Sequence, residues 1–447
     1  MATIYPFRAF HYDAAKAGTG WDQLVTQPYD KITPAMQERY LGLSPYNLVR
    51  LHKGRSEPDD NGENVYTRAR KWLEDWTRAG ILAQDPRPAL YPYFQDYTAP
   101  QTSERRLRKS FIALGKIEDY AAGIVYRHEQ TLTGPKLDRL ELLRQTRAHF
   151  GQIFMLYTDP AGDVERALDE AISALALQTV EDEYGVRHRL WTLDDTAAVA
   201  RIQSLMAGKK LIIADGHHRY ETALAYRDQC RSASAKTDAD APHEKVVMTF
   251  VNTEAPGLTI LPTHRVVANV SWFSFARFRD AAARFFDWIT YPSGSGEDTA
   301  EKRRRFRHDL AARGAGRPAF GVAAAGEPAL LLFLLKENAD LAGWLPEVSP
   351  LQRQLDLVLL HRLLLDRCLG LDEESVRKEK NLSYLRDADE ALGLVAGGQA
   401  QLAFLTNPIR VEQVRDVALA GEVLPQKSTD FYPKLLSGLT LYRLDLP

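Results

Sequence analysis

The chain has 447 residues, a formal net charge of −2, 45% hydrophobic and 26% charged residues, and two cysteines. This length predicts two or three domains, and the composition is that of a globular protein with an ample core. The near-neutral charge gives no general reason to bind nucleic acid or anionic membranes, and two cysteines exclude a disulfide framework. The chain lacks a long apolar window and a secretory signal pattern, so we expect a cytoplasmic protein without membrane spans.

Short strands and helices are predicted for the first part, residues 1–104. Strands are expected at 4–10, 48–51 and 89–97, and helices at 34–41 and 65–79. In the second part, 105–270, strands are expected at 106–117, 153–157, 187–192, 211–214 and 246–252, and helices at 137–150, 164–176 and 194–206. In the third part, 271–447, helices are expected at 273–286, 352–368 and 411–419, and strands at 329–335, 401–406 and 439–444. Alternating strands and helices favour an α/β or α+β fold.

A strand, a glycine turn and a helix start follow one another at residues 211–226. The apolar run 211–214 predicts a buried strand, Gly216 a turn, and 221–226 a helix. The junction carries four polar side chains: Asp215, His217, His218 and Arg219. A helix N-terminus attracts anions, and the arginine and imidazoles favour phosphate. The alternative interpretation is a tight turn with an N-cap aspartate and solvated histidines.

A second polar segment precedes the helix expected at 137–150. Its reactive side chains include His128, Glu129, Thr131, Lys136 and Arg139. A loop carboxylate beside a histidine suits general-base catalysis, which makes Glu129 a candidate. The alternatives are a helix cap for Thr131 and ordinary helix-surface charges for Lys136 and Arg139.

The third segment lies near the C-terminus and contains Lys427, Ser428, Thr429 and Lys434. Lysines act as point charges toward phosphate, and hydroxyl groups add hydrogen bonds. The alternative is a surface turn anchored by aromatic residues. A basic run at 105–109 is expected to be the solvated surface of an edge strand.

Several familiar motifs are excluded. The segment after Asp215 is neither a Walker A loop nor a G-x-G-x-x-G dinucleotide motif, and adjacent histidines lack the H-E-x-x-H spacing of a zinc site. No nucleophile elbow with a serine occurs either.

The three segments resemble a bacterial and archaeal family described as a domain of unknown function, number 1015. The resemblance rests on 214–223, on 128–139 and on 425–434, and it extends over essentially the whole chain. More distantly, 216–219 resembles the phosphate-binding motif of the ParB/sulfiredoxin superfamily. That resemblance implies a mixed-sheet core in the second part, with additional α/β parts on either side. His217 stands where sulfiredoxins carry cysteine, which excludes peroxiredoxin repair.

Free serine kinases of the same superfamily carry a similar Asp-Gly-His-His-Arg string and a catalytic glutamate from an earlier loop. The resemblance therefore implies a small-molecule phosphotransferase that forms O-phospho-L-serine from ATP, ADP or pyrophosphate with Mg²⁺. Glu129 would be the base, and Asp215 would help to hold Mg²⁺ or orient a histidine. The implied groups are catalytic His217 and His218; donor-binding Gly216, Arg219, Lys427, Ser428, Thr429 and Lys434; and substrate-binding His128, Thr131, Lys136 and Arg139.

Two other classes of function stay open. One is a ParB-like nucleotide-binding regulatory or DNA-partitioning protein, although no nucleic-acid partner is expected from the charge. The other is a metal-dependent phosphohydrolase that uses the histidines and Asp215. The sequence leaves the donor and the oligomeric state undetermined.

Overall fold

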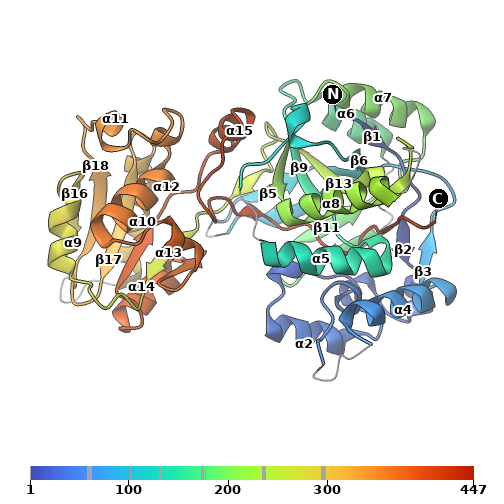
Figure 1. The fold of residues 1–447 in the computed structure, drawn as a ribbon, viewed down its shortest axis with the longest axis horizontal. Helices are drawn as coiled ribbons and strands as arrows, with labels where there is room; N and C mark the ends of the chain where they lie inside the picture. Colours follow the sequence, from blue (N-terminus) through green and yellow to red (C-terminus); the bar gives the residue numbers. More distant parts are fainter. Residues whose placement is uncertain are drawn as a thin grey trace. The chain divides into compact units, whose positions relative to one another are not determined.

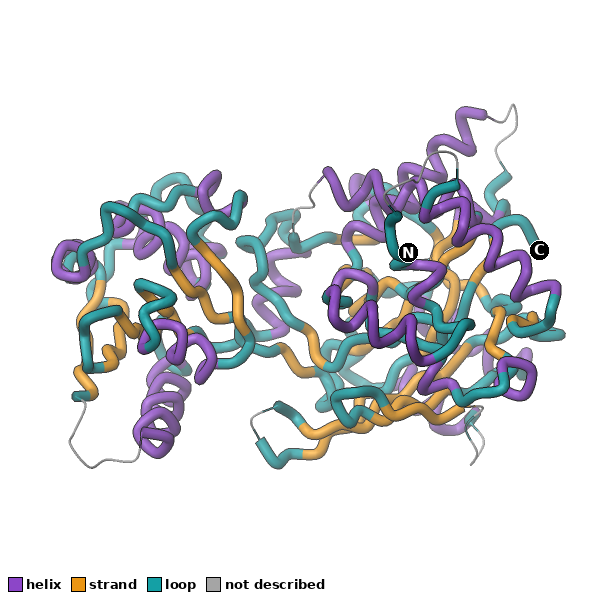
Figure 2. Tube along the Cα trace, turned by 90° about the horizontal axis from the view of Figure 1, so that it is seen from below, coloured by secondary structure: helices purple, strands orange, loops and turns teal. Residues whose placement is uncertain are grey.

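The structure, a computed structural model, describes residues 2–57, 63–100, 102–129, 133–172, 176, 178–233, 238–292 and 299–446. It divides into two compact units, Met1–Thr259 with Phe431–Pro447, and Ile260–Asp430. Each unit combines a sheet with helices, as Figures 1 and 2 show, so the α/β prediction is confirmed. The predicted division into three parts, 1–104, 105–270 and 271–447, stays a prediction.

The first unit is built from short strands and eight described α-helices. Its strands are β1 (Ile4–Tyr5), β2 (Phe10–Tyr12), β3 (Leu82–Gln84), β4 (Tyr91–Thr98), β5 (Arg105–Arg108), β6 (Phe111–Lys116), β7 (Val125–Tyr126), β8 (Ala148–His149), β9 (Ile153–Tyr157), β10 (Gln178–Glu181), β11 (Arg187–Leu190), β12 (Leu211–Asp215), β13 (Lys245–Asn252), β21 (Phe431–Tyr432) and β22 (Tyr442–Arg443), with β14 (Thr259–Ile260) at the unit boundary. Its helices are α1 (Ala14–Ala17), α2 (Pro34–Leu43), α3 (Val49–His52), α4 (Val65–Arg78), α5 (Thr133–Thr146), α6 (Asp163–Ala171), α7 (Thr196–Met206) and α8 (His217–Ala233), with 3₁₀ turns η1 (Trp21–Gln23), η2 (Tyr29–Lys31), η3 (Tyr120–Ala122) and η4 (Pro242–Glu244).

The main sheet of this unit is mixed. Its strand order is β10-β11-β4-β6-β13-β9-β12-β7, with β1 also pairing with β6 and β5 with β4. Most neighbours are antiparallel, but β13 runs parallel to β9, and β12 runs parallel to β7. The helices α6, α7 and α8 pack their apolar side chains into one core on this sheet, and α5 lies beside α8 (Figure 1).

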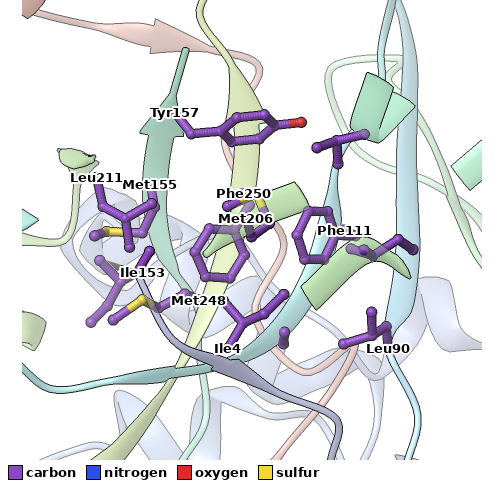
Figure 3. Packing of buried hydrophobic residues seen from close by; sticks show 14 of the residues in the cluster. Ile4, Leu90, Phe111, Ile153, Met155, Tyr157, Met206, Leu211, Met248 and Phe250 are labelled. Carbon is purple, nitrogen blue, oxygen red and sulfur yellow. The ribbon is translucent and has the colours of Figure 1, made fainter. Parts of the chain in front are cut away.

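The core of the first unit joins strands that are distant in sequence. Figure 3 shows Ile153 and Met155 of β9 packed with Phe250 of β13 and with Met206 of α7. The ring of Phe250 stacks on Phe111 with centroids 5.0 Å apart. Each such buried side chain contributes about 1.5–3 kcal/mol, so this core holds the strand ends in a defined arrangement.

The second unit has an antiparallel sheet of its own. Its six strands follow the order β16 (Phe286–Tyr291), β18 (Leu330–Leu335), β17 (Ala319–Ala324), β20 (Leu402–Leu405), β15 (His264–Val267) and β19 (Leu382–Leu385). Its helices are α9 (Phe275–Ala282), α10 (Thr299–Gly314), α11 (Leu341–Trp344), α12 (Asp356–Leu359), α13 (Glu373–Arg377), α14 (Ala388–Ala396) and α15 (Val411–Leu419), with the 3₁₀ turn η5 (Gln352–Gln354) and the π-helical η6 (Leu360–Cys368). Phe306 of α10 and Leu392 of α14 share one core, whereas Phe278 of α9 stacks on Phe333 at 6.1 Å.

Several of the predicted elements are wrong in type or extent. The strand predicted at 4–10 is two strands, β1 and β2, and the helix predicted at 352–368 consists of η5, α12 and the π-helical η6. Residues 48–51 belong to a helical turn, α3, because the Asn47 side chain accepts a hydrogen bond from the Val49 N–H at 3.0 Å and starts it. The helix predicted at 273–286 ends at Ala282, and Phe286 begins β16 because it pairs with Leu335 of β18. The predicted strand at 106–117 is two strands, β5 and β6. Among the helices that the structure describes, none is long and apolar enough to cross a membrane.

Candidate functional site

The parallel pairing of β7 and β12 brings two of the predicted segments together. Leu211 lies opposite Val125, and Ile212 lies opposite Tyr126. Parallel strands end at the same edge of a sheet, so the residues that follow them become neighbours. The loop with His128 and Glu129 therefore lies beside the start of α8, although the two are far apart in sequence.

Helix α8 begins at His217, directly after the glycine turn and before the run of helix formers predicted from residue 221. Gly216 has a φ of +93°, which side-chain-bearing residues rarely adopt. A Cβ added there would lie 3.0 Å from the guanidinium of Arg219. The glycine thus permits both the turn and the close approach of Arg219.

The carboxylate of Asp215 organises the positive charges at this turn. Lys434 Nζ donates to Asp215 Oδ2 at 2.9 Å, and Arg219 Nη2 lies 3.6 Å from Oδ1. Arg219 also donates through Nη1 to the carbonyl of Gln152. We call Asp215, Lys31, Arg219 and Lys434 the Asp215 cluster.

Positive charge exceeds negative charge within the Asp215 cluster. Burial by itself would raise the pKa of Asp215, but Lys434, Arg219 and Lys31 outweigh burial and hold that pKa well below its usual range. The carboxylate is therefore ionised, and three cations share it. Such an excess of positive charge beside a helix N-terminus favours a phosphate group.

Two buried imidazoles lie at the start of α8. The backbone N–H of His128 points at Nε2 of His217 at 3.5 Å, and the two rings meet edge to face with centroids 4.8 Å apart. Burial lowers the pKa of His128 to about 4 and that of His217 well below its usual value. Both rings are therefore neutral near pH 7, so they act there as hydrogen-bonding groups and not as cations.

Glu129 follows directly after His128 and is partly exposed. Its backbone therefore lies next to the ring pair at the start of α8. His218 is also partly exposed, next to the buried His217. Both side chains are thus partly accessible to solvent.

Two of the predicted substrate-binding cations lie on α5 and have partners within the protein. Lys136 Nζ lies 2.5 Å from Glu221 of α8. Arg139 donates to the carbonyl of His52 at 2.6 Å and lies over the ring of Tyr29 at 4.2 Å. Thr131, another predicted substrate-binding residue, lies outside the described residues.

Part of the C-terminal segment lies in the second unit. Lys427, Ser428 and Thr429 belong to Ile260–Asp430, whereas Lys434 belongs to the unit that contains Asp215. Within the second unit the Ser428 hydroxyl donates to the Pro425 carbonyl at 2.6 Å, and Lys427 has a φ of +58°. Of this segment, Lys434 is the residue that the structure places at Asp215.

A buried arginine that sequence reasoning missed holds the backbone around Lys434. Arg108, expected on a solvated surface, is 0% exposed and donates to the side-chain oxygen Oε1 of Gln95 and to the backbone carbonyl of Pro433. Gln95 in turn donates to the carbonyl of Lys434 at 2.9 Å. Burial lowers the pKa of Arg108 to about 10. Alternation along β5 puts Arg108 on the face opposite Leu107, so the local pattern favoured a solvated arginine and gave no signal of its burial.

The donor set does not fit a Mg²⁺ ion held by the protein alone. Among the residues that the structure describes, no group of three or more His, Cys, Asp or Glu side chains is arranged to bind a metal. Asp215 already faces Lys434 at 2.9 Å, and a dication there would meet three positive charges. Asp215 as a Mg²⁺ ligand thus stays a prediction that the local charge opposes.

Comparisons with known proteins agree with the family resemblance. The family described as "Protein of unknown function (DUF1015)" matches residues 4–358. No curated protein matches the chain.

Several solved structures are similar to this chain at low identity. A conserved hypothetical protein from Pyrococcus furiosus is 14% identical, with 72% of this chain and 93% of that chain covered and a TM-score of 0.34. A free serine kinase in complex with AMP is 15% identical, with coverages of 69% and 83% and a TM-score of 0.33. SbnI from Staphylococcus aureus, truncated at its C-terminus, is 11% identical, with coverages of 73% and 85% and a TM-score of 0.33.

Proposed function

The chain belongs to the DUF1015 family, whose name states no activity, and from the chemistry of its own site we propose that it is a small-molecule phosphotransferase. The favoured reaction is phosphorylation of the hydroxyl of free L-serine to O-phospho-L-serine. The donor would be ATP, ADP or pyrophosphate. The ParB/sulfiredoxin-like character of the core belongs to the same proposal.

The observation that carries the proposal is the meeting of an anion-binding helix start with a carboxylate-bearing loop. The pairing of β7 with β12 and the contact of His128 with His217 bring the loop that carries Glu129 to the beginning of α8. A phosphate site needs positive charge, and a phosphotransferase that acts on an alcohol also needs a proton acceptor. In this proposal Arg219 and Lys434 supply the positive charge, and Glu129 is the proton acceptor.

The residues divide the reaction between them. Arg219, Lys434 and the first N–H groups of α8 would neutralise the donor phosphates. Glu129 would accept the hydroxyl proton while the serine oxygen bonds to the terminal phosphorus and the bond from that phosphorus to the leaving phosphate breaks. Neutral His217 and His218 would hydrogen-bond to the transferring group. Positioning and charge neutralisation supply most of the rate enhancement in such transfers.

Phosphorus NMR tests this assignment directly. Purified protein is incubated with L-serine, Mg²⁺ and each donor in turn, and we expect an O-phosphoserine resonance with one of them. The matching loss of donor signal should identify the leaving group as ADP, AMP or phosphate. Absence of phosphoserine with all three donors would rule the kinase assignment out.

A further inference from the structure

A cavity of about 70 Å³ lies in the first unit between α5, α8, β8 and η2. Arg219 and Thr222 line it from α8, Arg139 and Leu143 from α5, and His149 from β8. The proposed phosphoryl transfer has used only Arg219 of these residues. The cavity therefore begins at the Asp215 cluster and extends along the side of α8 toward α5.

The cavity contains a buried hydroxyl group without a hydrogen-bond partner among the described residues. Thr222 is 5% exposed, and its Oγ1 has no partner. Both amide atoms of Gln152, which is 1% exposed, also have none, and the Gln152 carbonyl accepts from Arg219. Buried polar groups are normally satisfied, so an unsatisfied hydroxyl in a cavity wall indicates a ligand that completes it.

The charge of the lining favours an anion. The lining residues include the guanidinium groups of Arg139 and Arg219 and no carboxylate. Two imidazoles, His52 and His149, also line it; burial lowers the pKa of His149 to about 4 and that of His52 well below its usual value, so both are neutral. Apolar side chains such as Leu143, together with the hydroxyl-bearing Tyr29 and Ser437, complete the wall.

The size of the cavity decides which reactant it can take. One water molecule needs roughly 10–15 Å³ of such volume, so the cavity has room for about five to seven water-sized groups, each the size of one non-hydrogen atom with its hydrogens. A nucleotide is several times larger, whereas a hydroxy amino acid such as L-serine is of that size. The cavity thus has room for a small acceptor such as L-serine.

We propose that this cavity is the acceptor site and that it selects small hydroxy acids by their carboxylate. The carboxylate would pair with Arg139, which the proposed donor site does not use, and Thr222 would complete a hydrogen bond to the ligand's polar end. The location of the acceptor rests on the proposed phosphotransfer, but binding of a small carboxylate here does not. The acceptor would lie between α5 and α8, with its hydroxyl directed toward the start of α8.

Calorimetry without any donor tests the site. L-serine is titrated into the wild-type protein and into two isosteric variants, Thr222→Val and the control Thr249→Val. Thr249 is also fully buried with an unpartnered hydroxyl, but it lies on β13 outside the cavity lining. We expect Thr222→Val to weaken L-serine binding about tenfold and Thr249→Val to leave it unchanged. Equal affinities in the two variants would overturn the proposal.

Two further experiments, a second titration and a steady-state assay, test which class of ligand binds and whether the site serves the reaction. Ethanolamine, which keeps the amine and hydroxyl but lacks the carboxylate, should bind at least tenfold more weakly than L-serine; equal binding would contradict selection by carboxylate. In steady-state assays, Thr222→Val should raise KM for L-serine with kcat and the donor KM nearly unchanged.

The outcomes separate this proposal from the kinase assignment. If Thr222→Val weakens L-serine binding but no donor yields phosphoserine, the cavity is supported as a binding site and the kinase assignment is contradicted. If the protein forms phosphoserine but Thr222→Val leaves the KM for L-serine unchanged, the kinase assignment is supported and the cavity is contradicted as the acceptor site. Circular dichroism of each variant verifies that it is folded.

Discussion

At the scale of single residues, Asp215 is the centre of the charge distribution in the first unit. Its carboxylate lies 2.9 Å from Lys434 and 3.6 Å from Arg219. Arg219 belongs to α8, whereas Lys434 belongs to the C-terminal segment of the chain. The single negative charge of Asp215 thereby holds several cations in place, and the net positive charge that remains favours binding of an anion. Arg108 and Gln95 act one step further out, because they fix the backbone that carries Lys434.

Replacing Glu129 with glutamine should remove the proposed proton acceptor while keeping the size of the side chain. We expect kcat for phosphoserine formation to fall by about 10²–10⁴-fold, with little change in the KM for L-serine. The matched control is Glu170→Gln, on the exposed surface of α6, which should retain wild-type rates. A Glu129→Gln enzyme with full kcat would exclude Glu129 as the base.

Buried His128 should make stability depend on pH. Its folded-state pKa is about 4, below the unfolded value of about 6.5, so the unfolded chain takes up the proton first as the pH falls. The stability linked to neutral His128 is therefore complete above about pH 6.5, declines between about 6.5 and 4, and is lost below. Within this window one such proton changes the unfolding free energy by up to about 1.4 kcal/mol per pH unit.

Urea denaturation across that window measures the effect. His128→Gln should show a shallower decline than the wild type, because one titrating group has been removed. His308→Gln provides the control, since His308 is largely exposed, and its slope should match the wild type. Identical slopes for all three proteins would contradict a buried neutral His128.

At the scale of elements, the strand–turn–helix unit β12–Gly216–α8 positions the candidate site. The strand is buried on both sides by β7 and β9, and the helix packs Tyr220 and Ala223 into the same core. The first two turns of α8 carry the residues of the candidate site, from His217 to Thr222. The strand and the core-facing side of α8 are therefore held by packing, whereas the side of α8 that carries His218 is partly exposed.

Gly216→Ala should destabilise this unit and disturb Arg219. The positive φ disfavours any Cβ, and the added methyl would meet the guanidinium at 3.0 Å. We expect a loss of about 1–3 kcal/mol in unfolding free energy and weaker donor binding. Gly208→Ala is the control, because a Cβ there has nothing within 4 Å. Equal unfolding free energies for the two variants would show that the turn tolerates a side chain.

At the scale of the whole molecule, each unit has its own sheet and its own core. The first unit is completed by the last residues of the chain, Phe431–Pro447, which bring Lys434. The second unit is continuous from Ile260 to Asp430 and is inserted between the two segments of the first. A compact insertion of this kind is expected to carry enough core to fold independently.

A fragment of residues 260–430 should therefore unfold cooperatively on its own. Its antiparallel sheet is covered by α10 and α14 on one side and by α9 on the other. Thermal unfolding followed by circular dichroism should give a single sigmoidal transition, whereas a fragment of 271–430, which lacks β15, should not. A non-cooperative melt for 260–430 would mean that its core depends on the rest of the chain.

Local sequence patterns were sufficient for much of the fold and for the chemistry of the segments. The apolar run 211–214, the glycine after Asp215 and the amphipathic run 411–419 each carry short-range signals, and the structure has β12, a turn and α15 there. Polar residues crowded at a helix start likewise identify an anion site from residue types alone. The short run 48–51 was misread because a one-turn helix and a strand of that length have the same apolar pattern.

By itself, the sequence determined the α/β class, the family and the residue types at the helix start. Only the tertiary structure decided that β7 pairs with β12, that Lys434 meets Asp215, and that Arg108 is buried beneath it. The reason is physical: strand and turn signals arise among neighbours in the chain, whereas strand pairing and ion pairs depend on which distant surfaces bury one another. Asp215 and Glu129 could be recognised as candidate reactive groups from their neighbours, but the pairing of β7 with β12 that brings their two segments together is a property of the folded sheet.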